Sequence, residues 1–444
     1  MAETLGSDDI WTKLARIACL ARGAPTMVLT TLAHHVDVEF LREAWRMTRK
    51  DGAAGVDGQT AREYEERLEE NLASLLERFK SGTYRAPPVR RVYIPKGDGK
   101  KTRPIGIPTL EDKVLQRAVA LLLDAVYEQD FLPCSYGFRP YRSAHQALRD
   151  LREALMKMRG GWVIDLDIKS FFDTLDHGHL RSFLDKRVRD GLVRRMIGKW
   201  LKAGVMEEGR FFRPEAGSPQ GGVVSPILAN VYLHEVLDLW FEKEVRPRMR
   251  GQSHMVRYAD DAVLVFEKEE DARRVLDVLP KRFGKYGLTI HPEKTRLVDF
   301  RRPHGRDDQG GKPGTFSMLG FTLYWGKTRR GGKAVQLKTD RKRLARAVKR
   351  ANAFCQAIRH RPVGWQAAQL SQKLVGHYAY YGVTGNYRAI QHLRHLVVRV
   401  WHKWLGRRSQ KGYVTWARMH SILARYPLPL PRVVHSVYAR AANP

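Results

Sequence analysis

At residues 255–266 the chain reads Met255-Val256-Arg257-Tyr258-Ala259-Asp260-Asp261-Ala262-Val263-Leu264-Val265-Phe266. Apolar residues lie on both sides of an acidic pair, a pattern that predicts two buried strands joined by a tight turn. A second apolar stretch, from Trp162 to Ile168, predicts another buried strand and is interrupted by acids, among them Asp167. Because unpaired carboxylates are costly to bury, both stretches predict a cation beside them.

These acids suit one kind of chemistry if the two stretches are neighbours in a sheet. Joining a nucleotide to a growing strand is an in-line attack on phosphorus, in which two metal ions about 3.5–4 Å apart stabilise the attacking and leaving oxygens. Magnesium prefers hard oxygen ligands such as carboxylates. Asp167, Asp260 and Asp261 are therefore the candidate catalytic residues. An isolated Asp-Asp pair is more often a solvated turn and a lone Asp a helix cap, but here both acidic sites lie within strongly apolar segments.

The rest of the chain predicts helices around a small amount of sheet. Residues 10–80 are mainly helical apart from a glycine-rich loop at 52–58, and residues 110–127 form another helix. Residues 90–95 and 103–107 predict two short strands on either side of a basic hairpin tip. After Lys327 the chain is expected to turn helical, with a helix that starts at Thr339 or Asp340 and ends before Pro362.

The charge of the chain points to a polyanionic partner. Lys and Arg outnumber Asp and Glu by 79 to 47 in 444 residues, which gives a formal net charge of +32. From Lys327 to Pro444 we count 25 basic residues and one acid, Asp340. Basic faces can simply solvate helices, but helices that need only solubility usually mix both signs. We therefore expect contact with nucleic acid, weakening steeply with salt.

The cysteines and the N-terminus indicate where the protein works. Cys19, Cys134 and Cys355 are too widely separated for a disulfide framework or a zinc knuckle, so a reducing compartment is expected. The N-terminus has an acidic Ser7-Asp8-Asp9 in place of a basic leader, and no window of about eighteen uninterrupted apolar residues occurs. We expect a soluble protein of the bacterial cytoplasm or nucleoid, without a membrane partner.

Several motifs occur in an order that resembles one known family. The matching blocks are Asp51 to Gly58, Ile94-Pro95-Lys96, Arg103 to Pro108, Ser135 to Pro140, Asp167 to Asp173, Gly217 to Gly222, Ser225 to Asn230, Tyr258 to Asp261, Gly287 to Ile290, Lys294-Thr295, Leu319-Gly320-Phe321 and Leu374 to Tyr378. With these blocks the sequence resembles the group II intron-encoded reverse transcriptases and maturases over nearly its whole length. The resemblance is to the short class that lacks an HNH endonuclease domain, because the chain ends at Pro444 without paired cysteines.

The resemblance implies an α+β fold with a right-hand polymerase architecture. Fingers and palm, built from an antiparallel sheet and helices, are followed by a helical thumb or maturase domain. The implied boundaries are an N-terminal helical extension at 1–80, fingers and palm at 81–326, the thumb or maturase domain at 327–420 and a short basic DNA-binding segment at 421–444.

The resemblance also implies roles for individual residues at the polymerase centre. The metal ligands would be Asp167, Ile168, Asp260 and Asp261, holding two Mg²⁺ ions for which Mn²⁺ can substitute. The residues expected to bind the incoming nucleotide are Lys96 and Arg103 on its triphosphate, Gln220 beside it, Phe172 as a steric gate against the 2′-hydroxyl, and Lys294 as proton donor to the pyrophosphate. Phe172 as an ordinary core residue and Lys294 as an ordinary surface lysine remain alternatives.

A wider set of residues is expected to contact nucleic acid: Lys100, Lys101, Leu319, Gly320, Arg343, Arg346, Lys349, Arg350 and Tyr378. For Lys100 and Lys101 a solvated hairpin tip is the alternative. For Tyr378 and the aromatic residues near it, the alternative is helix packing.

The function implied is that of an RNA-directed DNA polymerase that also binds group II intron RNA and assists its splicing and mobility. Its partners would be an RNA template, a DNA target and primer, and deoxynucleoside triphosphates, and both a monomer and a homodimer remain open. Two alternatives are a non-catalytic RNA-binding maturase and a free-standing reverse transcriptase that serves repair or defence.

Overall fold

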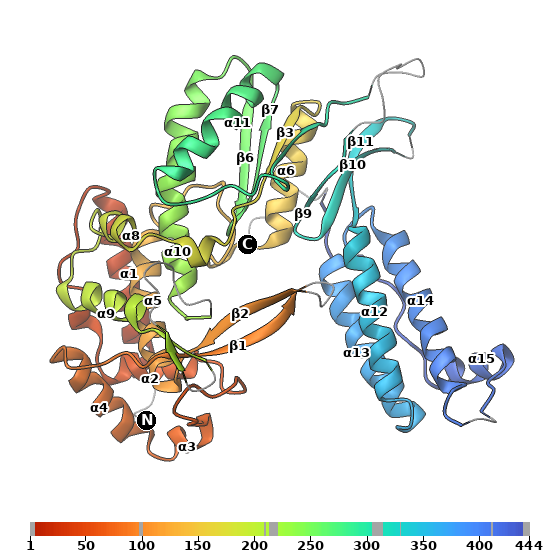
Figure 1. Cartoon of the computed structure of the whole chain (residues 1–444), viewed down its shortest axis with the longest axis horizontal. Coiled ribbons are helices and arrows are strands. Elements are labelled where there is room, and N and C mark those ends of the chain that lie inside the picture. Colours follow the sequence, from red (N-terminus) through yellow and green to blue (C-terminus); the bar gives the residue numbers. More distant parts are fainter. Residues whose placement is uncertain are drawn as a thin grey trace.

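The computed structural model describes residues 5–96, 101–207, 210–212, 221–303, 314–328, 330–409 and 412–437. It combines helices with three small sheets, which confirms the predicted α+β class (Figure 1). The N-terminal part is helical, as expected, and its elements are α1 (Leu5–Gly23), a 3₁₀ turn at Ala33–His35, α2 (Val38–Arg46), α3 (Ala61–Glu65) and α4 (Leu68–Lys80).

A four-stranded sheet and the central helix come next. Its strands, in the order β2-β1-β4-β5, are β1 (Val89–Lys96), β2 (Lys101–Ile107), β4 (Val205–Glu207) and β5 (Arg210–Phe212). The antiparallel β1–β2 pair is the predicted hairpin, and Figure 1 shows it extending away from the N-terminal helices. Helix α5 (Leu110–Tyr127) has the bounds expected from its apolar periodicity. The side chain of Thr109 caps its first turn. It packs against α1 and α2 in the largest hydrophobic core.

The second sheet carries the acids. Its order is β6-β7-β3-β8, formed by β3 (Trp162–Leu166), β6 (Ser253–Tyr258), β7 (Asp261–Phe266) and β8 (Arg296–Asp299), all antiparallel to their neighbours. Alternate residues face opposite sides. Ile164 therefore joins the large core, and Val163 joins a second core on the other side of the sheet. Helix α6 (Ala144–Lys157) precedes the first of these strands. The helices between the strands are α7 (Phe171–Thr174), α8 (His177–Leu184), α9 (Gly191–Lys202), α10 (Ser225–Leu233), the π and 3₁₀ turns at residues 234–248, and α11 (Glu269–Gly284).

A third sheet precedes the C-terminal helices. Its strands, in the order β11-β10-β9, are β9 (Phe316–Met318), β10 (Phe321–Lys327) and β11 (Lys333–Thr339). The expectation that the chain turns helical directly after Lys327 is therefore wrong. Residues 333–339 form a strand that pairs with all of β10, and the helices begin after this strand. The helix then begins as predicted, since the side chain of Asp340 accepts hydrogen bonds from the backbone amides of Lys342 and Arg343.

The last part of the chain is a separate helical bundle with its own core (Figure 1). It contains α12 (Arg341–Ala357), α13 (Val363–Tyr381), α14 (Tyr387–Leu405) and α15 (Trp416–Arg425). Pro362 caps the start of α13, so it marks the end of the preceding segment as expected. No described helix combines the length and apolar character needed to cross a membrane.

Candidate active site

Sheet register brings the three predicted catalytic acids together. β3 and β7 are antiparallel, and their last pair is Leu166 opposite Ala262. Asp167 and Asp261 each lie one residue beyond that pair, so they are neighbours at the same end of the sheet. Tyr258 pairs with Asp261 across the β6–β7 hairpin, which leaves Ala259 and Asp260 as its two-residue turn. The acids therefore share one end of the sheet although 94 residues (261 − 167) separate them in the sequence.

A buried arginine holds this turn in place. The guanidinium of Arg257 is fully buried and forms a two-pronged ion pair with Asp238, whose side chain is also fully buried, at 2.7 and 2.6 Å. The same guanidinium donates to the backbone carbonyl of Ala259 at 3.0 Å, to Ser135 Oγ at 2.7 Å and to Asn230 Oδ1 at 3.1 Å. One side chain thus joins β6, the helical segment at 230–238 and the loop after residue 134 to the carbonyl preceding Asp260.

The turn is also held from outside by Gly137. A Cβ atom at this position would lie 2.3 Å from the amide nitrogen of Ala259, so only glycine fits. Asn230 Nδ2 donates to the Gly137 carbonyl at 2.8 Å. Ala259 itself has φ +56°, a left-handed conformation that is uncommon outside glycine. These contacts fix a strained turn next to Asp260, an arrangement found where geometry matters for function.

Asp167 is fixed through its backbone. Its amide donates to Thr295 Oγ1 at 3.2 Å, and its carbonyl accepts from the amide of His291 at 2.8 Å. Lys169 donates its amide to the carbonyl of Thr289 at 2.8 Å, and Ile168 is buried and pairs with Ile290. The predicted blocks at 287–290 and 294–295 therefore support the acid-bearing loop.

Asp167 and Asp261 open into a cavity of about 520 Å³, and Asp260 lies in the adjoining turn. Its lining comes from the β3–β7 end of the second sheet, the turn between β9 and β10, and the start of α12: Asp165, Leu166, Asp167, Asp261, Ala262, Val263, Glu293, Lys294, Arg296, Ser317, Met318, Leu319, Gly320, Asp340, Lys342 and Arg343. The cavity thus lies where the second sheet, the third sheet and the helical bundle meet.

Electrostatic repulsion accumulates at the floor of this cavity. Burial raises the pKa of Asp261 to about 6, and the carboxylates of Asp260 and Asp167 act in the same direction. Part of Asp261 stays open to solvent, which screens some of this repulsion. Burial also raises the pKa of Asp165, against the effect of its ion pair with Arg296 at 3.3 Å. Carboxylates placed this close together are suited to a multiply charged cation.

A lysine supplies positive charge in the structure. Lys294 Nζ lies 3.0 and 3.1 Å from the two carboxylate oxygens of Asp167. Within the described residues, no group of three His, Cys, Asp or Glu side chains is arranged to hold a metal ion. The donors nevertheless fit magnesium, because they are hard carboxylate oxygens whose mutual repulsion a divalent cation relieves. Binding of a metal at Asp167 would therefore require Lys294 to give up this ion pair.

The predicted nucleotide-binding residues are placed as follows. Phe172 lies in α7, is half-buried, and packs edge-on against Phe171 with ring centroids 5.3 Å apart. Arg103 is exposed on β2 opposite Ile94, and the backbone of Lys96 ends β1. Gln220 lies outside the described residues.

The predicted nucleic-acid contacts divide between surface and core. Leu319 and Gly320 form the positive-φ turn between β9 and β10, and the Leu319 carbonyl accepts from the Tyr380 hydroxyl at 2.8 Å. Arg343, Lys349 and Arg350 are exposed on α12, and Arg346 is half-buried. Lys101 pairs with Lys96 through the backbone, and Lys100 lies outside the described residues.

Tyr378 is placed differently from the expectation. Its ring is buried in the bundle core, and its hydroxyl lies 3.4 Å from the Pro429 carbonyl. This placement makes Tyr378 a packing residue of the bundle.

Two features of the site were not predicted from the sequence. The first is Asp165, which lies two residues before Asp167 and lines the same cavity. Residues two apart in a strand point to the same face of the sheet, so this spacing could have predicted that Asp165 lies beside Asp167. The second is the role of Arg257. The sequence shows only a charged residue within an apolar strand, and its partner Asp238 lies 19 residues earlier in the chain.

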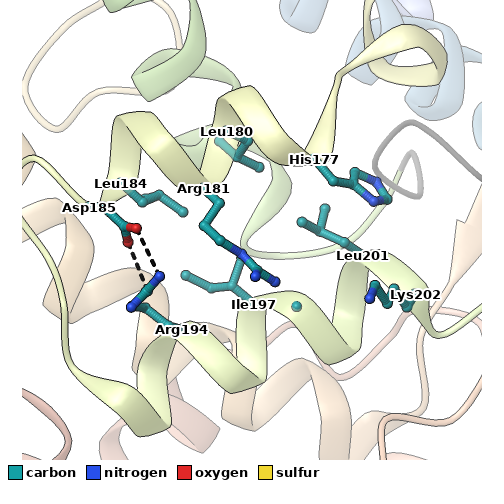
Figure 2. Close-up of a pocket in the computed structure, with 10 residues that line it drawn as sticks. His177, Leu180, Arg181, Leu184, Asp185, Arg194, Ile197, Leu201 and Lys202 are labelled. Atoms are coloured by element: carbon teal, nitrogen blue, oxygen red, sulfur yellow. Dashed lines mark hydrogen bonds and ion pairs between the residues drawn. The ribbon is translucent and has the colours of Figure 1, made fainter.

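A second polar region lies on α8 and α9. Figure 2 shows the small pocket between these helices, where Asp185 and Arg194 form an ion pair at 2.7 Å. Beside it is a groove of about 470 Å³ lined by Arg85, Ala86, Arg181, Arg194, Arg195, Gly198, Lys199, Lys202 and Ala203. This groove is strongly basic and carries no acid in its lining.

Comparisons with known proteins agree with this architecture. The family model described as reverse transcriptase (RNA-dependent DNA polymerase) matches residues 94–323, just over half of the chain. Protein YkfC of Escherichia coli (strain K12) is 34% identical over 332 residues, which cover 66% of this chain and 82% of that protein.

Intron-encoded proteins match a shorter part. Group II intron-encoded protein LtrA of Lactococcus lactis subsp. cremoris is 38% identical over 244 residues, covering 53% of this chain but 40% of LtrA. Nuclear intron maturase 2, mitochondrial, of Arabidopsis thaliana is 28% identical over 233 residues, or 44% of this chain and 30% of that protein. From the family match and the extent of the likeness to YkfC, the chain belongs to the reverse transcriptase family, and its resemblance to group II intron proteins is confirmed.

Proposed function

We propose that the protein is an RNA-directed DNA polymerase that uses two divalent ions for nucleotidyl transfer. The observation that carries this proposal is the meeting of Asp167, Asp260 and Asp261 at one end of an antiparallel sheet. Mg²⁺ held by these carboxylates, with Ile168 beside them, would stabilise charge on the attacking and leaving oxygens, and Mn²⁺ would substitute. Membership of the reverse transcriptase family supports the same reaction.

The chain's own residues supply binding and proton transfer. Lys294, whose ammonium group lies 3.0 Å from Asp167, would donate a proton to the leaving pyrophosphate. Phe172 offers a half-buried ring beside the acids' loop, suited to exclude a 2′-hydroxyl. Lys96 and Arg103 on the hairpin strands would grip the triphosphate, with Gln220 beside the nucleotide.

The template and primer would run between the sheets and the helical bundle. The basic face of α12 with Arg343, Arg346, Lys349 and Arg350 is suited to a phosphate backbone, and the Leu319–Gly320 turn reaches the acid cavity. Lys100 and Lys101 would contact the strand from the hairpin. We assign residues 81–326 to fingers and palm, 327–420 to the thumb or maturase domain, 1–80 to an N-terminal extension and 421–444 to a DNA-binding segment.

We further propose that the protein binds group II intron RNA and assists its splicing and mobility. The likeness to group II intron-encoded protein LtrA and to nuclear intron maturase 2 of Arabidopsis supports this proposal. So does the basic groove on α9, a second positive surface apart from the acid cavity that can hold structured RNA by its phosphates. The DNA target and primer and deoxynucleoside triphosphates complete the expected set of partners.

Primer extension on an RNA template with magnesium tests the polymerase. The wild-type protein should extend a DNA primer, and Asp167→Asn should reduce extension to background, because the amide cannot replace a metal-binding carboxylate. RNA binding by the variant, measured by filter retention, should match the wild type. Absence of extension by the wild-type protein while it still binds intron RNA would replace this proposal with a non-catalytic RNA-binding maturase.

A further inference from the structure

The loop between α5 and α6 presents two aromatic rings to solvent. Phe138 is 54% exposed and Tyr141 is 98% exposed. Both residues have φ +58°, in the left-handed region that bulky side chains rarely adopt. Two strained residues, three positions apart, thus hold large aromatic rings away from any core.

A buried side chain lies between the two strained residues. Arg139 is almost fully buried, and its guanidinium donates to Glu128 at 3.0–3.1 Å and to the carbonyls of Leu132 and Ser135 at 2.8 Å each. At the far end of the loop, Ser143 caps α6 through a reciprocal bond with Gln146. Hydrogen bonds therefore fix the loop at Arg139, between the two exposed rings, and at Ser143, where α6 begins. These contacts hold the backbone that carries the rings in place.

The loop is also adjacent to the acids. Phe138 directly follows Gly137, whose backbone is in contact with Ala259 in the turn that carries Asp260. The same Gly137 carbonyl is bonded to Asn230, a partner of Arg257. Tyr141 is four residues from Gly137, so its backbone lies within roughly 14 Å of that contact. The loop that carries the two rings therefore adjoins the turn that carries Asp260.

We infer that Phe138 and Tyr141 form a stacking platform for unpaired bases of the nucleic-acid strand that enters or leaves the acid cavity. This inference rests on the proposed polymerase function. Bases stack on exposed aromatic rings without regard to sequence, which suits an enzyme that copies any template. The ligand class is a single-stranded polynucleotide, a polyanion that the net charge of +32 attracts to the protein. Strain at exposed residues persists where the arrangement itself is used.

The test removes the rings without disturbing the backbone. Asparagine tolerates left-handed φ better than phenylalanine or tyrosine does. The double variant Phe138→Asn/Tyr141→Asn should therefore keep or raise the melting temperature. Phe138→Tyr and Tyr141→Trp retain rings at the same positions and serve as conservative variants. Trp11→Gln is the matched control, because it removes a ring that is 46% exposed on α1.

The measurement is the dissociation constant of an RNA template–DNA primer with 2-aminopurine at successive unpaired positions, without nucleotides. We expect the loss of each ring to raise the dissociation constant about fivefold. The fluorescence of 2-aminopurine, which stacking quenches, should increase at one or two positions. The conservative variants and Trp11→Gln should bind as the wild type does.

Two results would overturn the inference. Unchanged affinity and quenching in the double variant, in a protein that extends primers normally, would reject the platform and leave the polymerase standing. A wild-type protein that neither binds nor extends the primer–template would reject both.

Discussion

Replacing Arg257 with methionine should separate the stability of the fold from the geometry of its acids. The change removes five hydrogen bonds and leaves Asp238, which is fully buried, without its counter-charge. Removing one partner of such a pair costs about 3–5 kcal/mol, a large part of the roughly 5–15 kcal/mol that stabilises a typical domain. The free energy of unfolding, measured in urea, should fall by about that amount.

The second consequence concerns the turn at Ala259 and Asp260. Without the bond from Arg257 to the Ala259 carbonyl, the strained turn is free to relax, and Asp260 moves with it. A displacement of about 1 Å at a catalytic group lowers the rate about 100-fold. We therefore expect a comparable loss in single-turnover primer extension and a higher Mg²⁺ concentration for half-maximal rate.

The double variant Arg257→Met/Asp238→Leu distinguishes the two effects. It removes both buried charges, so it should recover much of the lost stability, yet it still lacks the bond to Ala259. Arg187→Met is the matched control, because Arg187 is also buried, pairs with Asp130 at 2.8 Å and donates to backbone carbonyls away from the acids. It should lose stability without changing the Mg²⁺ dependence. Recovery of full activity in the double variant would refute the positioning role of Arg257.

Two further changes test the site more directly. Phe172→Ala should increase the incorporation of ribonucleotides relative to deoxyribonucleotides in single-nucleotide extension. If the discrimination between them is unchanged, Phe172 is an ordinary core residue and not a steric gate. The pKa of Asp261 is raised to about 6 in the folded protein without divalent ions. In the unfolded chain the same carboxyl group has its ordinary pKa of about 4, so between about pH 4 and 6 the folded state holds a proton that the unfolded state has lost. Stability should therefore decrease as pH rises from about 4 to about 6, while Mg²⁺ affinity measured by calorimetry increases through pH 6. Asp261→Asn should flatten both dependences.

Local patterns predicted the elements that carry the acids. The strands at 162–166, 253–258 and 261–266 follow from apolar runs around charged positions, and α5 follows from its helical period. The meeting of Asp167 with the pair at 260 and 261 was predicted because strands of this kind pair in one sheet.

Contacts between distant segments could not be predicted in this way. Arg257 reaches Ser135 across 122 residues, and a single sequence contains no sign of that pairing. Tyr378 illustrates another limit, because the helical stripe that contains it does not say which face is covered; the bundle buries it. The strand at 333–339 was missed although its residues alternate, because the basic composition after Lys327 favoured helices.

Asp340 gives the C-terminal region an unusual dependence on one side chain. It is the single acid among the 25 basic residues that follow Gly326. It caps α12 and also accepts from Ser317 and Thr322, at 3.2 and 3.4 Å, so it pins the basic helix to the third sheet. Arg343, one turn along, lines the same cavity as Asp261, and its positive charge opposes the rise in the pKa of that carboxyl group. A displacement of the bundle at this contact would change the positive charge that faces the acids, so the binding of nucleic acid to the bundle and the binding of Mg²⁺ to the acids would depend on each other.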